Sequence, residues 1–378
     1  MSTIAVLGTG IVGTAAAWDL TRRGHDVVVA DTRPEAVAAA ARIAGARSTA
    51  LDATDDTAVR RLLDGADAVV SAVPYALGVA VAQAAIATST HYFDFGGNPT
   101  IVGRQLLLDE AARHAGIALV PDCGLAPGMA DVLAVGVVAA LGVGPIDEVR
   151  LRVGALPQVP TGALGYQLAF NPAGLINEYA EPCEIVTGGR YATVEPLTGT
   201  ETVAWEGWGP LEAFHTAGGS SSLPRRWEGR VAELDYKTLR FPGHGIIFRA
   251  MLEAGLFDET PQPGSGVAPR TVLLEALAKH LPSGAPDLVL ARVWGTAQRN
   301  GTTATVGYQV DDRHDGRFSA LARTTAFPAT ALAHLVVTGA VATRGACTMD
   351  GALEADEMIA ALDGTGIAFT PYAPHPSR

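Results

Sequence analysis

The sequence is poor in cysteine, in charged residues and in aromatic side chains. Its 378 residues include 3 cysteines, while charged and aromatic residues make up 17% and 6% of the chain. Cysteines that lie far apart, without C-x-x-C spacing, exclude a disulfide framework and a cysteine-rich zinc site. Apolar residues reach 48%, which is typical of a chain with a compact core and excludes a disordered protein.

Positive charge is scarce as well. The chain has 27 Lys and Arg against 39 Asp and Glu, a formal net charge of −12. Such a surface repels phosphate backbones, so we expect no nucleic-acid partner. The apolar stretch 130–143 is interrupted by Asp131 and is shorter than the roughly 20 residues of a membrane span. Because no signal segment precedes the first β-rich run, we expect a cytoplasmic protein with no membrane partner.

The first third of the chain alternates short β-rich runs with Ala-rich helical ones. This alternation predicts βαβ units and a doubly wound parallel sheet. The expected strands cover 3–7, 26–30, 48–51, 68–72, 91–95 and 117–121. The expected helices cover 12–23, 34–44, 55–64, 76–88 and 101–115.

The pattern changes after Pro121, where strands and long loops replace the alternation. A helix over 130–141 is followed by strands near 148–153, 184–186, 191–194, 231–236, 288–295 and 303–309. Helices are expected near 243–255, 269–281 and 328–342. The fold class is therefore α/β, with an N-terminal Rossmann domain over 1–125 and an α+β substrate domain over 126–344. We expect a C-terminal helix, within about 345–378, to pack back on the first domain.

A dinucleotide fingerprint lies between the first expected strand and the first helix. Gly8, Gly10 and Gly13 form a G-x-G-x-x-G pattern there, and Asp31 ends the second strand 18 residues after Gly13. Glycines allow a tight turn, close approach of the pyrophosphate and close packing of the helix on the strand. The helix start, at Ile11 and Val12, offers N–H groups to the phosphates.

The carboxylate of Asp31 favours NAD over NADP, because it bonds ribose hydroxyls and repels a 2′-phosphate. Arg33, two residues later, leaves NADP possible. Other cofactor contacts are expected where strands end, since open α/β sheets bind ligands there. These further cofactor candidates are Thr32, Asp52, Ala53, Ala72, Val73, Pro74, Asp94 and Gly97. We expect no metal.

Three sequence blocks contain more polar and titratable side chains than folding requires. They are PDCGLAPGM at 121–129, NPAGLINEY at 171–179 and DYKTLRFPGH at 235–244. Their order and spacing resemble the saccharopine dehydrogenase family, and within it the L-lysine 6-dehydrogenase (lysine ε-dehydrogenase) group. The likeness extends over nearly the whole chain. Phe241 departs from it, because tyrosine is expected there, and so does the loop lengthened by Gly207-Trp-Gly.

The resemblance implies an NAD(P)-dependent oxidoreductase that acts on the CH–NH2 group of an amino acid. It also implies that the α+β domain makes a homodimer. For the lysine enzymes the reaction is oxidative deamination of L-lysine at the ε-amine. Hydride leaves Cε for nicotinamide, and water releases ammonia from the resulting imine. The semialdehyde then cyclises to piperideine-6-carboxylate.

That chemistry assigns roles to polar residues in the blocks and near them. A base must keep the amine neutral, and His244, Lys237 and Tyr236 are the candidates. Arg240 suits bidentate capture of the substrate carboxylate. Asp122, at a strand end, is expected to hold a substrate amine. The remaining candidates for substrate or water binding are Glu212, Thr216 and Asn177.

Two alternatives stay open. A saccharopine-type or carboxyspermidine-type enzyme would act on a secondary amine and need a further cation or acid in its pocket. Arg240 is the one obvious arginine in the conspicuous block, which favours the smaller substrate, although Arg150, Arg152, Arg225 and Arg226 are further candidates. A non-catalytic NAD-sensing protein would need the glycine loop alone.

Overall fold

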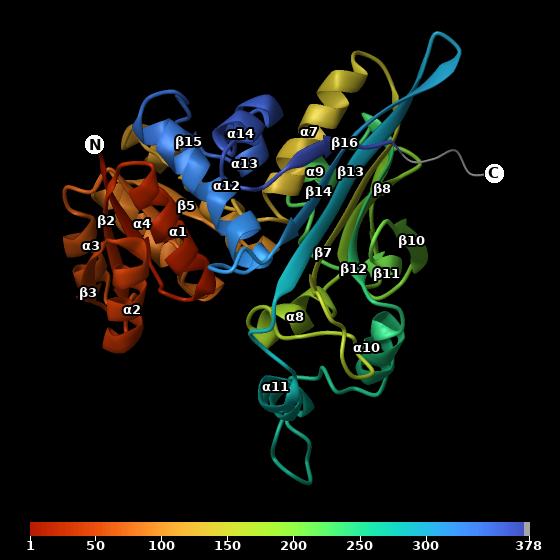
Figure 1. Ribbon diagram of the computed structural model, residues 1–378, viewed down its shortest axis with the longest axis horizontal. Coiled ribbons are helices and arrows are strands. Elements are labelled where there is room, and N and C mark those ends of the chain that lie inside the picture. The colour runs from red at the N-terminus through yellow and green to blue at the C-terminus, as the bar shows by residue number, and fades with distance from the viewer. Residues whose placement is uncertain (374–378) are drawn as a thin grey trace. The chain divides into compact units, whose positions relative to one another are not determined.

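The computed structural model of the chain describes residues 1–373. They form two compact units (Figure 1). Unit 1 comprises Met1–Gly136 and Asp315–Ala368, and unit 2 comprises 137–314 together with the described residues from Phe369 onward. This division differs from the boundaries expected from the sequence, because residues 126–136 and 315–344 belong to unit 1.

Unit 1 is built on a parallel sheet with the strand order β15-β6-β5-β4-β1-β2-β3. The strands are β1 (Thr3–Leu7), β2 (Asp26–Asp31), β3 (Arg47–Ala50), β4 (Ala68–Ser71), β5 (His91–Asp94), β6 (Ala118–Val120) and β15 (Gly345–Ala346). Short apolar runs with both faces buried are typical of such strands. The predicted doubly wound parallel sheet is confirmed. Its order reverses between β1 and β4, the switch point at which α/β sheets bind ligands.

Helices follow most of these strands. They are α1 (Ile11–Arg22), α2 (Pro34–Ala44), α3 (Asp56–Leu63), a 3-10 turn at Tyr75–Leu77, α4 (Gly78–Ala87), α5 (Pro99–Leu106), α6 (Asp109–His114), α12 (Ala320–Val337), α13 (Met349–Ala352) and α14 (Ala355–Ala361). A further helix, α7 (Met129–Leu141), contains the boundary between the units. The helix predicted over 101–115 is therefore two helices, α5 and α6.

Helix α12 begins earlier than the sequence predicts. The prediction placed its start at Pro328, but Ser319 caps it by accepting a hydrogen bond of 3.0 Å from the Ala322 N–H. Pro328 lies inside the helix. Among the described helices, α12 alone is long and apolar enough to cross a membrane. It is 72% buried inside the structure, as core helices of folded proteins also are.

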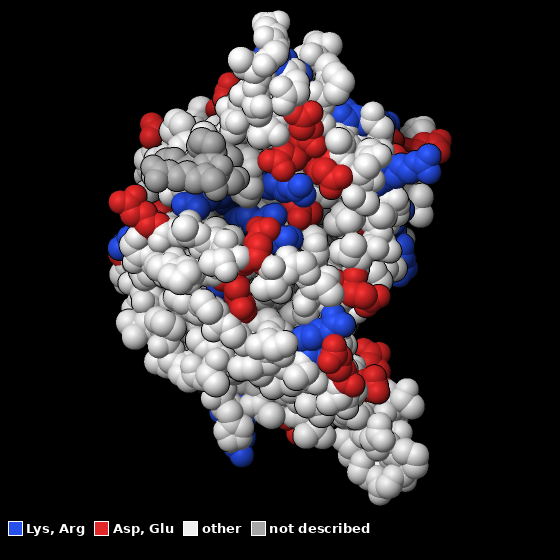
Figure 2. Space-filling model, turned by 90° about the vertical axis from the view of Figure 1, so that its right-hand side faces the viewer, with Lys and Arg blue, Asp and Glu red and all other residues white. Residues whose placement is uncertain are grey.

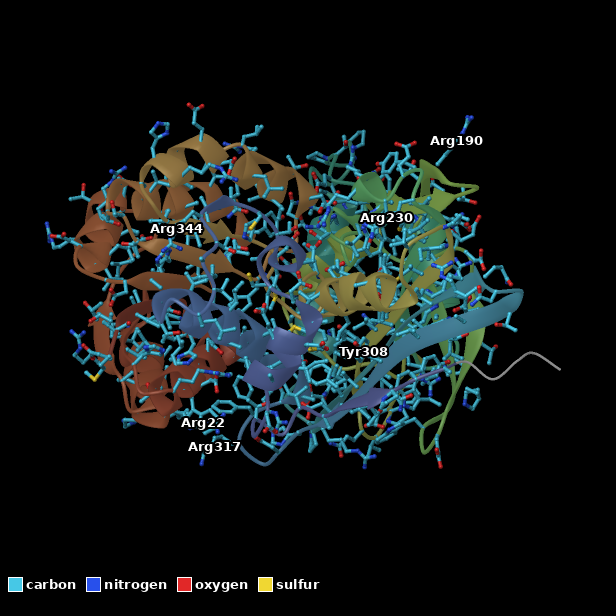
Figure 3. The ribbon with its side chains drawn as sticks, turned by 90° about the horizontal axis from the view of Figure 1, so that it is seen from above. Arg22, Arg190, Arg230, Tyr308, Arg317 and Arg344 are labelled. Carbon is cyan, nitrogen blue, oxygen red and sulfur yellow. The ribbon has the colours of Figure 1, made fainter. Side chains whose placement is uncertain are left out.

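Helix α12 packs against α1 through a buried acid and a surface aromatic. The Asp19 carboxylate accepts hydrogen bonds from Arg23 and from the Thr330 hydroxyl, both at 2.6 Å. Trp18 packs against rings of Phe318 and Phe327. The guanidinium carbons of Arg22 and Arg317, which lie near each other in Figure 3, are 5.4 and 4.9 Å from the centroid of the Trp18 ring.

Unit 2 is built on a larger mixed sheet with the order β10-β11-β12-β7-β13-β14-β16, in which β8 also pairs with β12 and with β9. The strands are β7 (Ile146–Pro157), β8 (Cys183–Thr187), β9 (Arg190–Val194), β10 (Glu201–Trp205), β11 (Gly209–His215), β12 (Val231–Arg240), β13 (Asp287–Arg299), β14 (Thr302–Arg313) and β16 (Phe369–Pro371). The helices are α8 (Pro172–Glu178), α9 (Leu223–Arg226), α10 (His244–Glu253) and α11 (Pro269–His280). The predicted α+β class is confirmed, whereas β10, β11, β16, α8 and α9 were not predicted.

Because β12 is pleated, successive side chains along it point to opposite faces of the sheet. Tyr236, Thr238 and Arg240 point to one face of the sheet, while Asp235 and Lys237 point to the other. On the second face the sheet curls upon itself, since Arg292 of β13 donates to the Ala204 carbonyl of β10 at 2.7 Å. The first face is covered by α8 and α10, which lie at the lower end of the strands in Figure 1.

The C-terminal segment divides between the units. Gly345 and Ala346 pair with β6 in unit 1, and β16 pairs with β14 in unit 2. The helix expected within 345–378 corresponds to α13 and α14 of unit 1. Residues 374–378 of that expected segment lie outside the described residues.

Replacing Asp19 by alanine should lower the free energy of unfolding by about 3 kcal/mol or more, because a buried network loses its acceptor. The matched control is Asp26→Ala, which removes an exposed pair with Arg47 and should cost less than about 1 kcal/mol. Urea denaturation of both variants measures the difference. Equal losses would show that the α1–α12 contact does not depend on Asp19.

Candidate functional site

The glycine loop of unit 1 has the geometry that a dinucleotide needs. Gly8 has φ +91, and a Cβ there would lie 2.5 Å from the Ala72 carbonyl oxygen. A Cβ on Gly13 would lie 1.9 Å from the carbonyl oxygen of Gly8, so the turn and the helix pack too closely for any side chain. Gly10 has no atom within 4 Å of its Cβ position. That open space is where a pyrophosphate can approach the backbone.

The start of α1 faces this open space. Gly10 is the N-cap residue and provides no side-chain cap, so the N–H groups of the first turn, at Ile11 and Val12, are available to an anion. A cavity of about 200 Å³ lies beside them. Its lining residues come from α1, from the ends of β4 and β5, from the 3-10 turn and from the start of α4: Val12, Ser71, Ala72, Val73, Tyr75, Gly78, Asp94, Phe95 and Gly96. These residues fit the nicotinamide dinucleotide that the fingerprint predicts.

Asp31 is held by its neighbours at the end of β2. Its carboxylate accepts from the N–H and hydroxyl of Thr9, at 2.8 and 2.9 Å, and from the guanidinium of Arg33 at 3.1 Å. Thr32 donates a longer bond of 3.4 Å. Burial opposes ionisation, but the bonds from Arg33 and Thr9 outweigh it and hold the pKa of Asp31 well below its usual range. Arg33 is 67% exposed, so it is free to turn away when a ribose binds.

The other predicted cofactor residues lie in different surroundings. Ala72, Val73 and Asp94 line the cavity, and Pro74 follows directly in the chain. Asp52 is exposed, and its carboxylate accepts from the N–H and hydroxyl of Thr54 at 2.9 and 2.8 Å. These two bonds stabilise the turn in which Asp52 lies. Ala53 packs on the unit 1 core. Gly97 has φ +99, while its neighbour Gly96 lines the cavity.

Asp94 organises the end of β5. Its carboxylate accepts from the Tyr92 hydroxyl at 2.7 Å, from the Gln105 amide at 2.6 Å and from the Gly96 N–H at 2.8 Å. Burial raises the pKa of Asp94 in spite of these bonds. A Cβ on Gly96 would lie 1.7 Å from the Asp122 carboxylate, so Asp122 packs directly over this turn. Asp122 itself has φ +58.

The predicted base Lys237 lies on the opposite face of β12 from Arg240. Its amine is 2.8 Å from the Glu201 carboxylate and 3.8 Å from that of Asp235. Asp235 is also bound by Arg150 and Arg152. Figure 2 shows cationic and anionic side chains gathered together on a face of the molecule. The amine of Lys237 is therefore engaged with carboxylates on the face of β12 opposite to Arg240, and its role as a base stays a prediction.

His244 lies at the start of α10, at the end of a directed chain of hydrogen bonds. Its Nδ1 is 3.1 Å from the Leu164 carbonyl oxygen, which can only accept, so this nitrogen carries the proton. Its Nε2 then accepts from the Tyr179 hydroxyl at 2.9 Å. The oxygen of that hydroxyl accepts from Nε of Arg240 at 3.0 Å.

The contacts of His244 in this chain of hydrogen bonds do not favour its predicted role as a general base. Burial, followed by the charge of Arg240, lowers the pKa of His244 to about 3. Its only free lone pair is used by Tyr179. His244 therefore positions Tyr179 and, through it, Arg240.

Four other predicted residues are also engaged with protein groups. The Glu212 carboxylate accepts from the N–H groups of Gly243 and Gly245, at 3.0 and 2.6 Å, and so holds the start of α10. The hydroxyls of Thr216 and Thr238 are 2.7 Å apart. The Asn177 amide accepts from Arg270. The ring of Tyr236 lies 2.3 Å from where Gly219 would carry a Cβ. Glu212, Thr216, Asn177 and Tyr236 thus contact protein groups in this structure, and their roles at the site stay predictions.

Arg240 remains as the predicted substrate residue whose charge has no carboxylate partner. Its Nη1 donates to the Leu239 carbonyl at 2.9 Å, and its guanidinium carbon is 5.2 Å from the centroid of the Tyr166 ring. Within residues 1–373 no group accepts from its Nη2. This nitrogen is the available donor on the face covered by α8 and α10.

Sequence reasoning missed Glu178, at the end of α8. Its carboxylate has no hydrogen bond or ion pair among the described residues, although its backbone carbonyl accepts from Ala217 at 2.9 Å. Burial raises the pKa of Glu178 to about 7, while the charge of Arg240 acts in the opposite direction. The sequence placed Glu178 in a polar block but gave no sign of α8, so the surroundings of its carboxylate could not be predicted.

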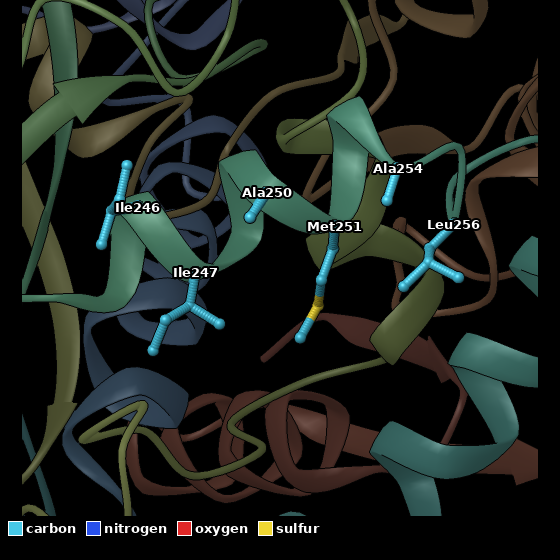
Figure 4. A pocket seen from close by; sticks show the side chains of 6 residues that line it. All are labelled: Ile246, Ile247, Ala250, Met251, Ala254 and Leu256. Atoms are coloured by element: carbon cyan, nitrogen blue, oxygen red, sulfur yellow. The ribbon is translucent and has the colours of Figure 1, made fainter.

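A shallow hollow on α10 carries no reactive group. It is lined by Ile246, Ile247, Ala250, Met251, Ala254 and Leu256 (Figure 4). Apolar side chains provide neither a proton acceptor nor a charge, so this hollow is not a reaction site. Among the described residues, no group of three His, Cys, Asp or Glu side chains is arranged to hold a metal ion.

Replacing Asp31 by serine should shift binding from NADH toward NADPH, because the carboxylate no longer repels a 2′-phosphate and Arg33 is released to pair with it. We expect the ratio of the two dissociation constants to change by about tenfold or more, the value of one charged hydrogen bond. Titration of NADH and NADPH by fluorescence measures both constants. An unchanged ratio would show that Asp31 does not set the preference.

Replacing His244 by glutamine should weaken the acid dependence of stability. The pKa of His244 is about 3 when folded and 6.5 otherwise, so its contribution is present above about pH 6.5 and is lost as the pH falls toward 3. Between these pH values the unfolding free energy of the wild type should fall more steeply with decreasing pH than that of the variant. The difference between the two slopes should correspond to the uptake of up to about one extra proton on unfolding. Urea denaturation at several pH values compares the slopes, and parallel slopes would contradict the buried neutral imidazole.

Residues 4–120 match the profile of the saccharopine dehydrogenase NADP binding domain, and residues 124–367 match that of the saccharopine dehydrogenase C-terminal domain. Curated relatives include saccharopine dehydrogenases (NADP+, L-glutamate-forming). The one from Schizosaccharomyces pombe is 24% identical over 303 residues, which cover 76% of this chain and 66% of the relative. The one from Pyricularia oryzae is 24% identical over 268 residues, which cover 69% and 59%.

The chain thus spans about two thirds or less of the length of these relatives. The solved structure of apo saccharopine dehydrogenase (L-Glu forming) from Saccharomyces cerevisiae matches with a TM-score of 0.80 and 18% identity. The match covers 99% of this chain and 100% of that one, which shows a shared fold. Because the two profiles together extend over nearly the whole chain, the chain belongs to the saccharopine dehydrogenase family.

Proposed function

We propose that the chain is an NAD(P)-dependent oxidoreductase that oxidises an amino acid at an amine-bearing carbon, and that its substrate is L-lysine, oxidised at the ε-amine. The products are ammonia, reduced cofactor and the semialdehyde that cyclises to piperideine-6-carboxylate. Unit 1 supplies the dinucleotide loop, and unit 2 supplies a binding face for the amino acid. When bound, the nicotinamide accepts the hydride that leaves the substrate.

The observation that carries this proposal is the position of Arg240. It is buried on the face covered by α8 and α10, is held by Tyr179 and Leu239, and keeps Nη2 unpaired. A rigid, unpaired guanidinium in such surroundings is suited to bind a carboxylate. The reacting amine must also be neutral, because an ammonium has no lone pair to assist departure of hydride. We therefore expect activity to rise toward alkaline pH.

The other arginines favour a substrate with a single carboxylate. Arg150 and Arg152 lie on the opposite face of the sheet and are paired with carboxylates, including that of Asp235. Arg225 is paired with Glu184. The buried pairing of Arg150 and Arg152 leaves neither of them for the additional carboxylates of saccharopine, and Arg225 forms its pair at the surface. This arrangement supports L-lysine over the larger secondary amine.

A second candidate is a saccharopine-type dehydrogenase, which splits or joins a secondary amine. The names of the curated relatives favour it, since these relatives are saccharopine dehydrogenases that form L-glutamate. A non-catalytic NAD-sensing protein would not need a buried cation on the face of unit 2. The two enzymatic candidates differ in the products that they release.

The deciding experiment is a panel of L-lysine, saccharopine and carboxyspermidine, each with NAD and with NADP at alkaline pH. We expect L-lysine to yield reduced cofactor and ammonia in equal amounts. Lysine labelled with ¹⁵N at the ε-position should release the label, whereas lysine labelled at the α-position should retain it. Turnover of saccharopine without turnover of L-lysine would establish the second candidate instead.

Replacing Arg240 by methionine should lower kcat/KM for L-lysine by about 100-fold or more, because a charged hydrogen bond to the carboxylate is lost. Cadaverine, which has the same amine but no carboxylate, should be oxidised equally by the variant and the wild type. Arg249→Met is the matched control, since Arg249 pairs with Glu253 at the surface. A loss of activity toward cadaverine as large as that toward lysine would contradict the role of Arg240.

A further inference from the structure

Two histidines of unit 1 meet where α1 and α12 pack together (Figure 1). His25 lies in the turn between α1 and β2, and His334 lies in the last turn of α12, 309 residues further along the chain. Nε2 of His25 is 2.9 Å from Nδ1 of His334, and the two ring centroids are 5.1 Å apart. The two imidazoles therefore share one hydrogen bond across the α1–α12 contact.

The surroundings of the rings assign the proton in this bond. Nδ1 of His25 is buried and has no hydrogen-bond partner among the described residues. A proton on that nitrogen would have no acceptor, so His25 carries its proton on Nε2 and donates it to Nδ1 of His334. His334 then carries its own proton on Nε2. Both rings are neutral in this arrangement.

An additional proton has no favourable position on either ring. On His25 it would occupy Nδ1, which is buried without an acceptor. On His334 it would occupy Nδ1, where it would meet the N–H of His25 instead of a lone pair. Proton uptake therefore requires the two rings to separate. Burial above all lowers the pKa of both histidines, and it is followed by the charge of His334 for His25 and by that of Arg23 for His334.

Charged and titratable groups occur on each element that packs against the pair. They are Asp19, Arg22 and Arg23 at the end of α1, Asp26 of β2, Asp67 before β4, His91 and Asp94 of β5, Asp356 and Glu357 of α14, and the amino terminus of the chain. Two of these acids, Asp19 and Asp67, favour a positive charge on the pair. Asp19 already accepts from Arg23 at 2.6 Å, and Asp67 accepts from the Thr3 N–H at 2.7 Å. The surroundings as a whole keep both rings neutral near pH 7.

We propose that His25 and His334 form a pH-sensitive contact, which fastens the end of α12 to the end of α1 when both rings are neutral and releases it on proton uptake. One helical turn before His334, the Thr330 hydroxyl donates to Asp19 at 2.6 Å and provides a second attachment. Release is therefore expected to be local, in the last turn of α12 and the residues that follow it, while the parallel sheet stays folded. This inference is independent of the proposed function, since it involves neither substrate nor turnover.

Hydrogen exchange of the full chain, measured by mass spectrometry at pH 7.5 and pH 5.5, tests the proposal. Rates are corrected for the intrinsic rate of exchange at each pH. A histidine in water has a pKa of about 6.5, so one proton taken up at pH 5.5 should favour the released form by about tenfold. We expect the amides of residues 334–341 to exchange about tenfold faster at pH 5.5 than at pH 7.5. Peptides of β1 and β4 are the internal reference and should not change.

A double variant, His25→Gln with His334→Asn, retains a hydrogen bond and removes both titrating rings. The Gln amide nitrogen replaces Nε2 of His25 as donor, and the Asn amide oxygen replaces Nδ1 of His334 as acceptor. We expect residues 334–341 of this variant to exchange equally slowly at both pH values. His114→Gln is the matched control, since it removes an exposed histidine of α6 and should behave like the wild type.

Two results would overturn the proposal. One is a wild type in which residues 334–341 exchange at the same corrected rate at pH 5.5 and pH 7.5. The other is a folded double variant that still exchanges about tenfold faster at pH 5.5, because the acceleration would then come from other groups. The wild-type measurement needs no substitution, so it decides the question even if the double variant does not fold.

Discussion

The buried guanidinium of Arg240 is the group around which the inner face of unit 2 is organised. Its Nε donates to Tyr179, whose hydroxyl donates to His244, whose Nδ1 donates to the Leu164 carbonyl. Each bond fixes the direction of the next, so the phenol and the imidazole stay neutral. The start of α10, held separately by the carboxylate of Glu212, keeps His244 in place. A single cation can therefore remain buried in a defined orientation.

The pleat of β12 separates two kinds of charge. On one face Lys237 and Asp235 belong to a network whose cations and carboxylates satisfy one another, and that network stabilises the curled sheet. On the other face Arg240 has no carboxylate partner among the described residues, and its Nε donates to the Tyr179 hydroxyl. Residues that are neighbours in the sequence thus serve opposite purposes. The network with matched charges serves the fold, and the guanidinium of Arg240, which has no carboxylate partner among the described residues, is suited to a ligand.

The dinucleotide site of unit 1 is built from residues that are close together in the sequence. The turn after β1 leaves no room for a side chain at Gly8 or Gly13, and it leaves the backbone open at Gly10. Asp94 gathers hydrogen bonds from Tyr92, Gln105 and the following turn, which holds the edge of the cavity beside the glycine loop. The wall of the dinucleotide site is therefore built mainly from backbone and small residues, and its polar side chains act by fixing that backbone.

The sequence by itself determined the features that depend on neighbouring residues. The parallel sheet, the glycine turn, the acid at the end of β2 and the resemblance to the family all follow from local spacing, because strand runs and glycine conformations are local properties. Only the tertiary structure decided which polar residues face one another. Lys237 and His244 share a block with Arg240, yet the pleat turns Lys237 away, and burial deprives His244 of its basicity. Tyr179 lies 61 residues before Arg240 and bonds to it because α8 packs on the face that Arg240 occupies. Electrostatic surroundings are set by long-range packing, and no local pattern encodes them.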